Sequence, residues 1–419
     1  MLSNEIHAIL IFVLLPLCSA VIVTVPIKRT TIRFKFDDWQ FYNQHVGTFQ
    51  KSKTDYQHPL NRRDQSTFYH ILYSTSIGIG TPSQPFTASV DLSWSDTFVP
   101  SIACLQDPVT AQYCREQNKY DASLSTTYHP SKANAQIMYE GLSTSGHLSQ
   151  DVLRIGGLEI PDQQFEEATF WRSMYSNGAP LDSALGLARL QSRTPASNVS
   201  TKSTLRNMLD QKVLSRPVFS LRLPRRDDES GELALGYVPS EALAQSTVTI
   251  PLIDATPPED LSQLSYYISS GYTVELDSVA IQSPPSDNPG ARKASRYKAV
   301  FTNSFSYISL PATLLTEIQT HLHPNLGMGD QLADLNCSMH DELPNIVFSF
   351  SKDAVIVLTP WDYLTEVQDI DKGKRCVLPF AYLPQVNEEW VVLGSAFMEG
   401  VHTAFDLEKS KVSLLKLDD

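Results

Sequence analysis

The chain has 419 residues, of which 42% are hydrophobic, and a formal net charge of −13. This length allows two or three domains with proper cores, and the negative charge argues against nucleic acid as a partner. Short apolar runs, 26 Pro and 17 Tyr favour many strands over long helices, so we expect a β-dominated fold.

Residues 1–20 are interpreted as a secretory signal peptide. Ala8–Leu17 is an apolar run, and Cys18-Ser19-Ala20 supplies small residues for cleavage. A membrane anchor is the alternative, but the run is too short to span a bilayer comfortably. No later stretch is long and apolar enough, and the C-terminus lacks a hydrophobic tail, so no stable membrane anchor is expected.

Residues 21–63 form a basic stretch with eight Lys and Arg against three acids. It ends at Arg62-Arg63, a dibasic pair of the kind that processing proteases cut. We interpret it as a pro-segment, and an ordinary charged extension is the alternative. The expected destination of the protein is extracellular, or an acidic compartment of the secretory route such as the vacuole.

The rest of the chain predicts strands separated by turns, with a few short helices. The segments Gln136–Glu140 and His147–Ile155 predict a hairpin with a long tip over residues 141–146. The stretch Tyr272–Ile281 alternates strongly between apolar and polar residues. The two halves are expected to meet near residues 240–250, which gives an N-terminal lobe over 64–245 and a C-terminal lobe over 246–419. The other predicted strands are Phe68–Ile79, Pro85–Asp91, Val218–Leu223, Leu233–Gly236, Ile346–Phe350, Val355–Leu358, Val391–Leu393 and Val412–Leu415, and the predicted helices are Leu205–Lys212 and Pro311–His321.

Two stretches, Ala88–Pro100 and Ala299–Pro311, repeat one pattern. Aligned on Asp91 and Thr302, each has apolar residues just before, Ser four positions later and Pro nine positions later. Each is also followed by an apolar-apolar-Gly triplet, which ends at Gly186 in the first copy and at Gly394 in the second. The chain therefore reads as two copies of one folding unit, with a carboxylate in the first and a hydroxyl in the second.

Four cysteines remain once Cys18 leaves with the signal peptide, and an even number in a secreted chain predicts two disulfides. Three pairings are possible, and sequence proximity favours Cys104 with Cys114 and Cys337 with Cys376. Asn198-Val199-Ser200 is a glycosylation sequon in a polar loop, so modification of Asn198 is expected. Asn336 begins a second sequon that is less suitable, because its middle residue is Cys337.

The sequence contains no zinc signature, P-loop, dinucleotide fingerprint or serine-hydrolase elbow. His321 and His323 lie two residues apart beside Pro324 and are interpreted as surface residues. No metal and no cofactor are expected.

From about Tyr73 onward the chain resembles the pepsin-like aspartic proteases. The resemblance implies an all-β dominated, bilobal fold with an internal pseudo-twofold duplication, a monomer, and a peptide-binding cleft between the lobes. It also implies that Tyr139 lies in a flap over that cleft. The matching pieces are Ile77–Pro82, Val90 to Ser101, the hairpin at Tyr139, Leu185–Ala188, Tyr272–Leu276, the Cys337/Cys376 pair, Val392–Gly394, Phe397 and Phe405-Asp406.

Members of that family use two carboxylates that share one proton and activate a water. Each carboxylate normally lies in an Asp-Thr-Gly context. Here Asp91 is followed by Leu92 and Ser93, and the position of the second Asp is taken by Thr302, followed by Asn303 and Ser304. A Thr hydroxyl cannot share a proton at acid or neutral pH.

Bulky residues also stand near both turns. Trp94 and Phe305 occupy places of small hydroxyl residues, and Phe98 replaces a Trp that normally pairs with the flap Tyr. The leading interpretation is a pseudoprotease that binds a peptide or protein, or a carbohydrate, in or beside the cleft. One alternative is a weakly active or atypical endopeptidase that uses Asp91, and another is a structural protein without a groove ligand. Asp182, just before the first triplet, is expected to serve the fold.

Overall fold

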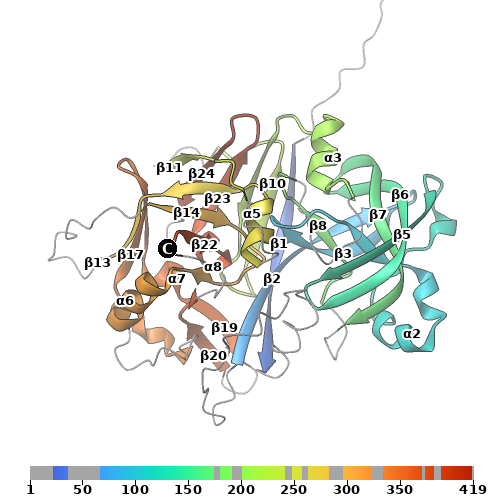
Figure 1. Cartoon of the computed structure of the whole chain (residues 1–419). Helices are drawn as coiled ribbons and strands as arrows, with labels where there is room; N and C mark the ends of the chain where they lie inside the picture. The colour runs from blue at the N-terminus through green and yellow to red at the C-terminus, as the bar shows by residue number, and fades with distance from the viewer. Residues whose placement is uncertain are drawn as a thin grey trace, which may run out of the picture.

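A computed structural model describes residues 22–35, 67–173, 180–190, 201–240, 248–256, 263–282, 296–322, 334–369, 373–381 and 388–417. Strands dominate this part of the chain, and its helices are short, which confirms the predicted β-dominated, two-lobed architecture. Strands β3, β5, β6 and β7 lie on one side of the molecule, and β13, β17 and α6 lie on the other, with β1 and β2 between them (Figure 1).

The first half of the chain builds ten strands and two helices within the described residues. The strands are β1 (Val23–Lys35), β2 (Thr67–Ile79), β3 (Gln84–Asp91), β4 (Phe98–Pro100), β5 (His129–Tyr139), β6 (Leu142–Ile155), β7 (Leu158–Ser173), β8 (Ser183–Gly186), β9 (Val218–Arg222) and β10 (Ser230–Leu235). The helices are α2 (Pro108–Cys114) and α3 (Thr204–Asp210), with 3-10 turns at Ile102–Leu105 and Ala122–Leu124.

The second half adds fourteen strands and four short helices in its described residues. The strands are β11 (Val248–Pro251), β12 (Thr273–Leu276), β13 (Ser278–Gln282), β14 (Tyr297–Phe301), β15 (Ile308–Ser309), β16 (Asp334–Leu335), β17 (Asn345–Ser351), β18 (Ala354–Leu358), β19 (Thr365–Asp369), β20 (Gly373–Val377), β21 (Phe380–Ala381), β22 (Trp390–Leu393), β23 (Val401–Asp406) and β24 (Lys411–Lys416). The helices are α5 (Gln263–Ser269), α6 (Ala312–Leu322), α7 (Pro360–Tyr363) and α8 (Ser395–Met398), with a 3-10 turn at Cys337–Asp341.

The largest sheet joins the two halves of the chain. Its main path runs β11-β24-β23-β9-β10-β1-β2-β6-β7-β4, so strands from near both ends of the chain belong to one sheet. Strand β1, which belongs to the predicted pro-segment, lies inside this path. Its first residues pair with β10 and its last residues pair with β2, both antiparallel.

In each copy of the repeated pattern, the strand that leads to the central residue pairs in parallel with the strand of the apolar-apolar-Gly triplet. Strand β3 pairs in parallel with β8, which places Asp91 opposite Gly186, and β14 pairs in parallel with β22. A Cβ on Gly186 would lie 2.5 Å from the carbonyl oxygen of Trp94, and one on Gly394 would lie 1.9 Å from that of Tyr307. The glycine of each triplet therefore lets the loop of its copy pack directly on the strand.

The predicted long hairpin tip over residues 141–146 is wrong. Strand β5 runs to Tyr139 and β6 begins at Leu142, which leaves only Glu140 and Gly141 in the turn. Both have positive φ, 45° and 81°, the backbone conformation that tight hairpin turns require. The alternating stretch over 272–281 also divides, because β12 and β13 belong to different sheets.

Two disulfides join Cys104 to Cys114 and Cys337 to Cys376, which confirms the favoured pairing. The predicted signal peptide over residues 1–20, Arg62-Arg63 and Asn198 lie outside the described residues. None of the helices in the described ranges is both long enough and apolar enough to span a membrane.

Candidate active site

Asp91 ends β3 and is only 1% exposed. Its Oδ1 accepts a hydrogen bond from the Ser93 amide at 2.7 Å, and its Oδ2 accepts one from the Tyr139 hydroxyl at 3.1 Å. The pKa of Asp91 is raised to about 7, mainly by burial and also by the nearby charge of Glu140, while hydrogen bonds from Ser93, Tyr139 and Ser304 oppose the rise.

Thr302 lies at the same point of the second copy and is fully buried. The Ser93 hydroxyl donates to Thr302 Oγ1 at 2.7 Å, and Thr302 Oγ1 also contacts the Ser304 hydroxyl at 2.9 Å. The two predicted site residues are therefore brought together, with Asp91 and Thr302 both bonded to Ser93.

Asn303 makes a second link between the turns. Its Oδ1 accepts from the Leu92 amide at 2.9 Å, and its Nδ2 donates to the Val90 carbonyl at 2.6 Å. In the sequence, Asn303 stands out only as a departure from the family pattern, and its link between the turns was not predicted. The aligned positions of Ser93 and Ser304, each two residues after the central residue, were the signal for the hydroxyl contacts.

The groups that hydrogen-bond Asp91 within the described chain are an amide and hydroxyls. The nearest other acid of the first motif, Asp96, instead accepts bonds from the amide and hydroxyl of Thr201 at 3.1 and 2.6 Å. Among the described residues, no three or more His, Cys, Asp or Glu side chains are grouped to hold a metal ion. The site thus combines one carboxyl group with several hydroxyls.

Aromatic side chains cover the carboxyl group of Asp91. The Tyr139 ring lies 4.6 Å from that of Trp94 and 5.6 Å from that of Phe98, centroid to centroid. Exposed fractions are 3% for Tyr139, 2% for Trp94 and 0% for Phe98. The hairpin at Tyr139 is thus closed on the site, with the Tyr139 ring packed against Trp94 and Phe98 and its hydroxyl bonded to Asp91.

The tip of the same hairpin is also tied to β2. Glu140 Oε2 lies 2.9 Å from His70 Nε2, and both side chains are mostly buried. Because Glu140 follows Tyr139 directly, one contact holds the hairpin to Asp91 and the next holds it to β2.

The family model for eukaryotic aspartyl proteases matches residues 72–417. The chain belongs to this family. It is 28% identical to a vacuolar aspartic protease of Candida albicans, over 88% of this chain and 82% of that protein. It is also 28% identical to cathepsin D of Dictyostelium discoideum (83% and 84% covered) and 26% identical to pepsin A of Sus scrofa (82% and 80% covered).

Asp182 has the bonds of a structural residue in this aspartyl protease fold. Its Oδ2 accepts from the Thr87 amide at 2.9 Å and from Asn118 Nδ2 at 2.8 Å, and its Oδ1 accepts from the Asn118 amide at 3.0 Å. These bonds join the segment before β8 to β3, in line with the expected role.

Proposed function

We propose that this member of the aspartyl protease family is a pseudoprotease that binds a peptide or protein segment in or beside the interlobe cleft. The observation that carries the proposal is the hydroxyl of Thr302 at the second turn, bonded to Ser93 at 2.7 Å. A hydroxyl cannot alternate with Asp91 in holding one proton, so the shared-proton activation of water lacks its second group.

The closed arrangement of the site supports the same proposal. Asp91 is buried beneath Tyr139 and Trp94, so a water between Asp91 and a peptide carbonyl would have to displace aromatic rings. Because the pKa of Asp91 is raised to about 7, its carboxyl group is protonated at acid pH. A protonated carboxyl cannot act as the general base toward water.

The names of the relatives and the N-terminal sequence bear on location. Relatives are named vacuolar proteases and cathepsin D. We propose that this chain enters the secretory route through residues 1–20, carries a glycan at Asn198, and works as a monomer outside the cell or in an acidic compartment such as the vacuole.

The alternative function is an atypical or weakly active aspartic endopeptidase. The observation that favours it is that Asp91 is still present at the first turn, where its Oδ2 accepts a hydrogen bond from the Tyr139 hydroxyl. In this alternative Asp91 would act alone, with the hydroxyls of Ser93 and Thr302 holding a water.

The catalytic test is hydrolysis of quenched, unstructured peptides by the purified protein from pH 2 to 7. We expect the wild-type protein and the Asp91→Asn variant to give the same rate as buffer. Cleavage that pepstatin inhibits and that disappears in Asp91→Asn would establish the endopeptidase instead.

The binding test uses a defined library of unstructured peptides passed over the immobilised protein. We expect a subset to be retained by the wild-type protein and by Ser351→Trp, whose new side chain projects from an exposed position at the end of β17. Ser304→Trp, which adds bulk beside Thr302, should lose that subset. If the wild-type protein retains no peptide, the binding function is wrong and a structural protein without a groove ligand is favoured.

A further inference from the structure

Strand β1 is an interior strand of the largest sheet. Val23 to Lys28 pair with β10, and Lys28 to Lys35 pair with β2, so the strand supplies hydrogen bonds to a neighbour along its whole length. Its inward residues Val23, Val25 and Ile27 alternate with exposed ones and are 3%, 4% and 0% exposed. They belong to the main hydrophobic core.

The fit around β1 is close. A Cβ on Gly156, in the turn between β6 and β7, would lie 2.5 Å from Val25 Cγ1 and 2.7 Å from Val23 Cγ1. The Thr75 hydroxyl of β2 donates to the Pro26 carbonyl at 2.9 Å. If β1 were absent, this site would expose apolar core residues and the edges of two strands.

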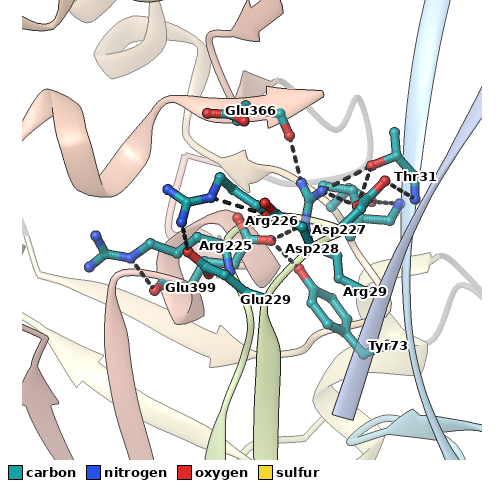
Figure 2. Close-up of polar contacts among 12 residues, drawn as sticks. Arg29, Thr31, Tyr73, Arg225, Arg226, Asp227, Asp228, Glu229, Glu366 and Glu399 are labelled. Atoms are coloured by element: carbon teal, nitrogen blue, oxygen red, sulfur yellow. Dashed lines mark hydrogen bonds and ion pairs between the residues drawn. The ribbon is translucent and has the colours of Figure 1, made fainter. Parts of the chain in front are cut away.

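Arg29 continues the inward face of β1 and is 3% exposed, which is rare for an arginine. Figure 2 shows its guanidinium at the centre of a polar cluster. Nε donates to Glu399 Oε1 at 2.8 Å, and Nη1 lies 2.5 Å from Asp227 Oδ1. Nη1 also donates to Thr31 Oγ1 at 2.9 Å, and Nη2 donates to the Glu366 carbonyl at 3.0 Å.

The partners of Arg29 come from both halves of the chain. Asp227 lies in the loop between β9 and β10, Glu366 lies in β19, and Glu399 follows α8. The Tyr73 hydroxyl of β2 also donates to Glu399 Oε1, at 2.6 Å. One side chain of β1 therefore joins the first half of the molecule to the second.

Removal of β1 would destabilise the buried carboxylate of Glu399, because Arg29 of that strand is its ion-pair partner. Its side chain is only 4% exposed, and its ion-pair contact within the described chain is Arg29. The carboxylate would keep a hydrogen bond from Tyr73 and the attraction of Arg225, which donates to the Glu399 carbonyl, but it would lose its ion pair in a buried place. Removal of one partner from a buried ion pair is strongly unfavourable, because the other charge stays without compensation.

We propose that residues 22–35 are a permanent strand of the folded protein, held by Arg29, and that they stay bound after a cut in the following chain. In the described residues, the hydrogen bonds of the Asp91 and Thr302 side chains come from outside β1. The strand is therefore a structural part of the sheet and not a cover of the candidate site. This inference does not depend on the proposed function.

The test places a site for a sequence-specific protease between residues 50 and 51 of the full chain, and cuts after folding. Native gel filtration and mass spectrometry then show whether the N-terminal fragment travels with the rest. We expect the wild-type fragment to co-elute and to separate only in denaturant. In Arg29→Met, the dissociation constant of the fragment should rise at least 100-fold.

Lys28→Met is the matched control, since Lys28 is the preceding residue of β1 and points to solvent. It should keep the fragment as the wild-type protein does. If Arg29→Met does not fold before the cut, Arg29→Lys replaces it. We then expect the dissociation constant of the fragment to rise at least tenfold, because Lys cannot make the forked contacts of an arginine. Release of the wild-type fragment under native conditions, or equal retention in the Arg29 and Lys28 variants, would overturn the proposal.

Discussion

At the scale of single residues, the site is defined by what surrounds one carboxyl group. Asp91 receives bonds from an amide and hydroxyls, and its pKa rises to about 7 mainly because it is buried. At the matching position of the second turn, the hydroxyl of Thr302 accepts a hydrogen bond from the Ser93 hydroxyl. The sequence already identified both positions, because the repeated pattern aligns them.

Asp91→Asn should change how stability depends on pH. Because the pKa of Asp91 is about 7 in the folded protein and near 3.8 otherwise, the unfolded chain loses this proton first as pH rises. In the wild-type protein, the contribution of Asp91 to the free energy of unfolding is therefore largest below about pH 4 and decreases as the pH rises to about 7. The variant lacks this loss, so at pH 8 it should be more stable than the wild-type protein by up to about 4 kcal/mol.

Urea unfolding at pH 4 and pH 8 measures this difference. Asp353→Asn, in the exposed turn between β17 and β18, is the matched control and should leave the pH slope unchanged. If the free energy of unfolding changed between pH 4 and pH 8 by the same amount in Asp91→Asn as in the wild-type protein, this would contradict the titration of Asp91 near neutral pH.

At the scale of elements, the two parallel strand pairs carry the turns. The loop that follows each central residue lies against the glycine of its triplet, and the Ser395 amide donates to the Phe305 carbonyl at 2.8 Å just after Gly394. The spacing of the repeated pattern was enough to predict that turn and triplet belong together. The short turn at Glu140 was not predicted, because the polar residues after Gly141 look like loop residues and yet continue the ladder.

Gly394→Ala should disrupt the second turn. The added Cβ would lie 1.9 Å from the Tyr307 carbonyl oxygen and 2.3 Å from that of Phe305, and backbone atoms can only yield if the loop moves. We expect a loss of at least about 3 kcal/mol or no soluble protein.

Gly400→Ala is the matched control, because its nearest atoms are side-chain carbons of Asp362 and Leu358 at 3.1 Å. It should cost roughly 1 kcal/mol, measured by urea unfolding. A Gly394→Ala protein as stable as the Gly400→Ala protein would argue against the close approach at the triplet.

At the scale of the whole molecule, the two-lobed fold was predicted from the duplication and the resemblance, but the position of β1 was not. Arg29 is separated by 198 residues from Asp227 and by 370 from Glu399, so local patterns contain no trace of the cluster. The alternation of Val23, Val25 and Ile27 was present in the sequence, but the basic composition around it drew the interpretation toward a removable segment.

The molecule as a whole should be more stable in mild acid than in mild alkali. Glu166 in β7 has a pKa raised to about 8 by burial, so its ionisation, like that of Asp91, costs stability as pH rises. His402 acts in the opposite direction, since burial lowers its pKa to about 4 and stability falls as pH drops from about 6.5. Between pH 5 and pH 8, the free energy of unfolding lost when Asp91 and Glu166 ionise is larger than the free energy lost at low pH when His402 is protonated.

Thermal unfolding should therefore give a Tm several degrees higher at pH 5 than at pH 8.5. Glu166→Gln should narrow that gap by raising the Tm at pH 8.5, since the amide keeps the shape of the side chain without a charge to bury. Glu159→Gln, at an exposed glutamate near the start of the same strand, serves as control. A Tm that is higher at pH 8.5 in the wild-type protein would refute this expectation.

The join between the two turns has a consequence for the lobes themselves. It consists of the hydroxyls of Ser93 and Thr302, the amide side chain of Asn303, and the backbone of Val90 and Leu92. None of these groups gains or loses a charge in the pH range where proteins stay folded. The join between the lobes at this point therefore holds no titrating group of its own, and a change in the acidity of the compartment would reach it through Asp91, which accepts a hydrogen bond from the Ser93 amide.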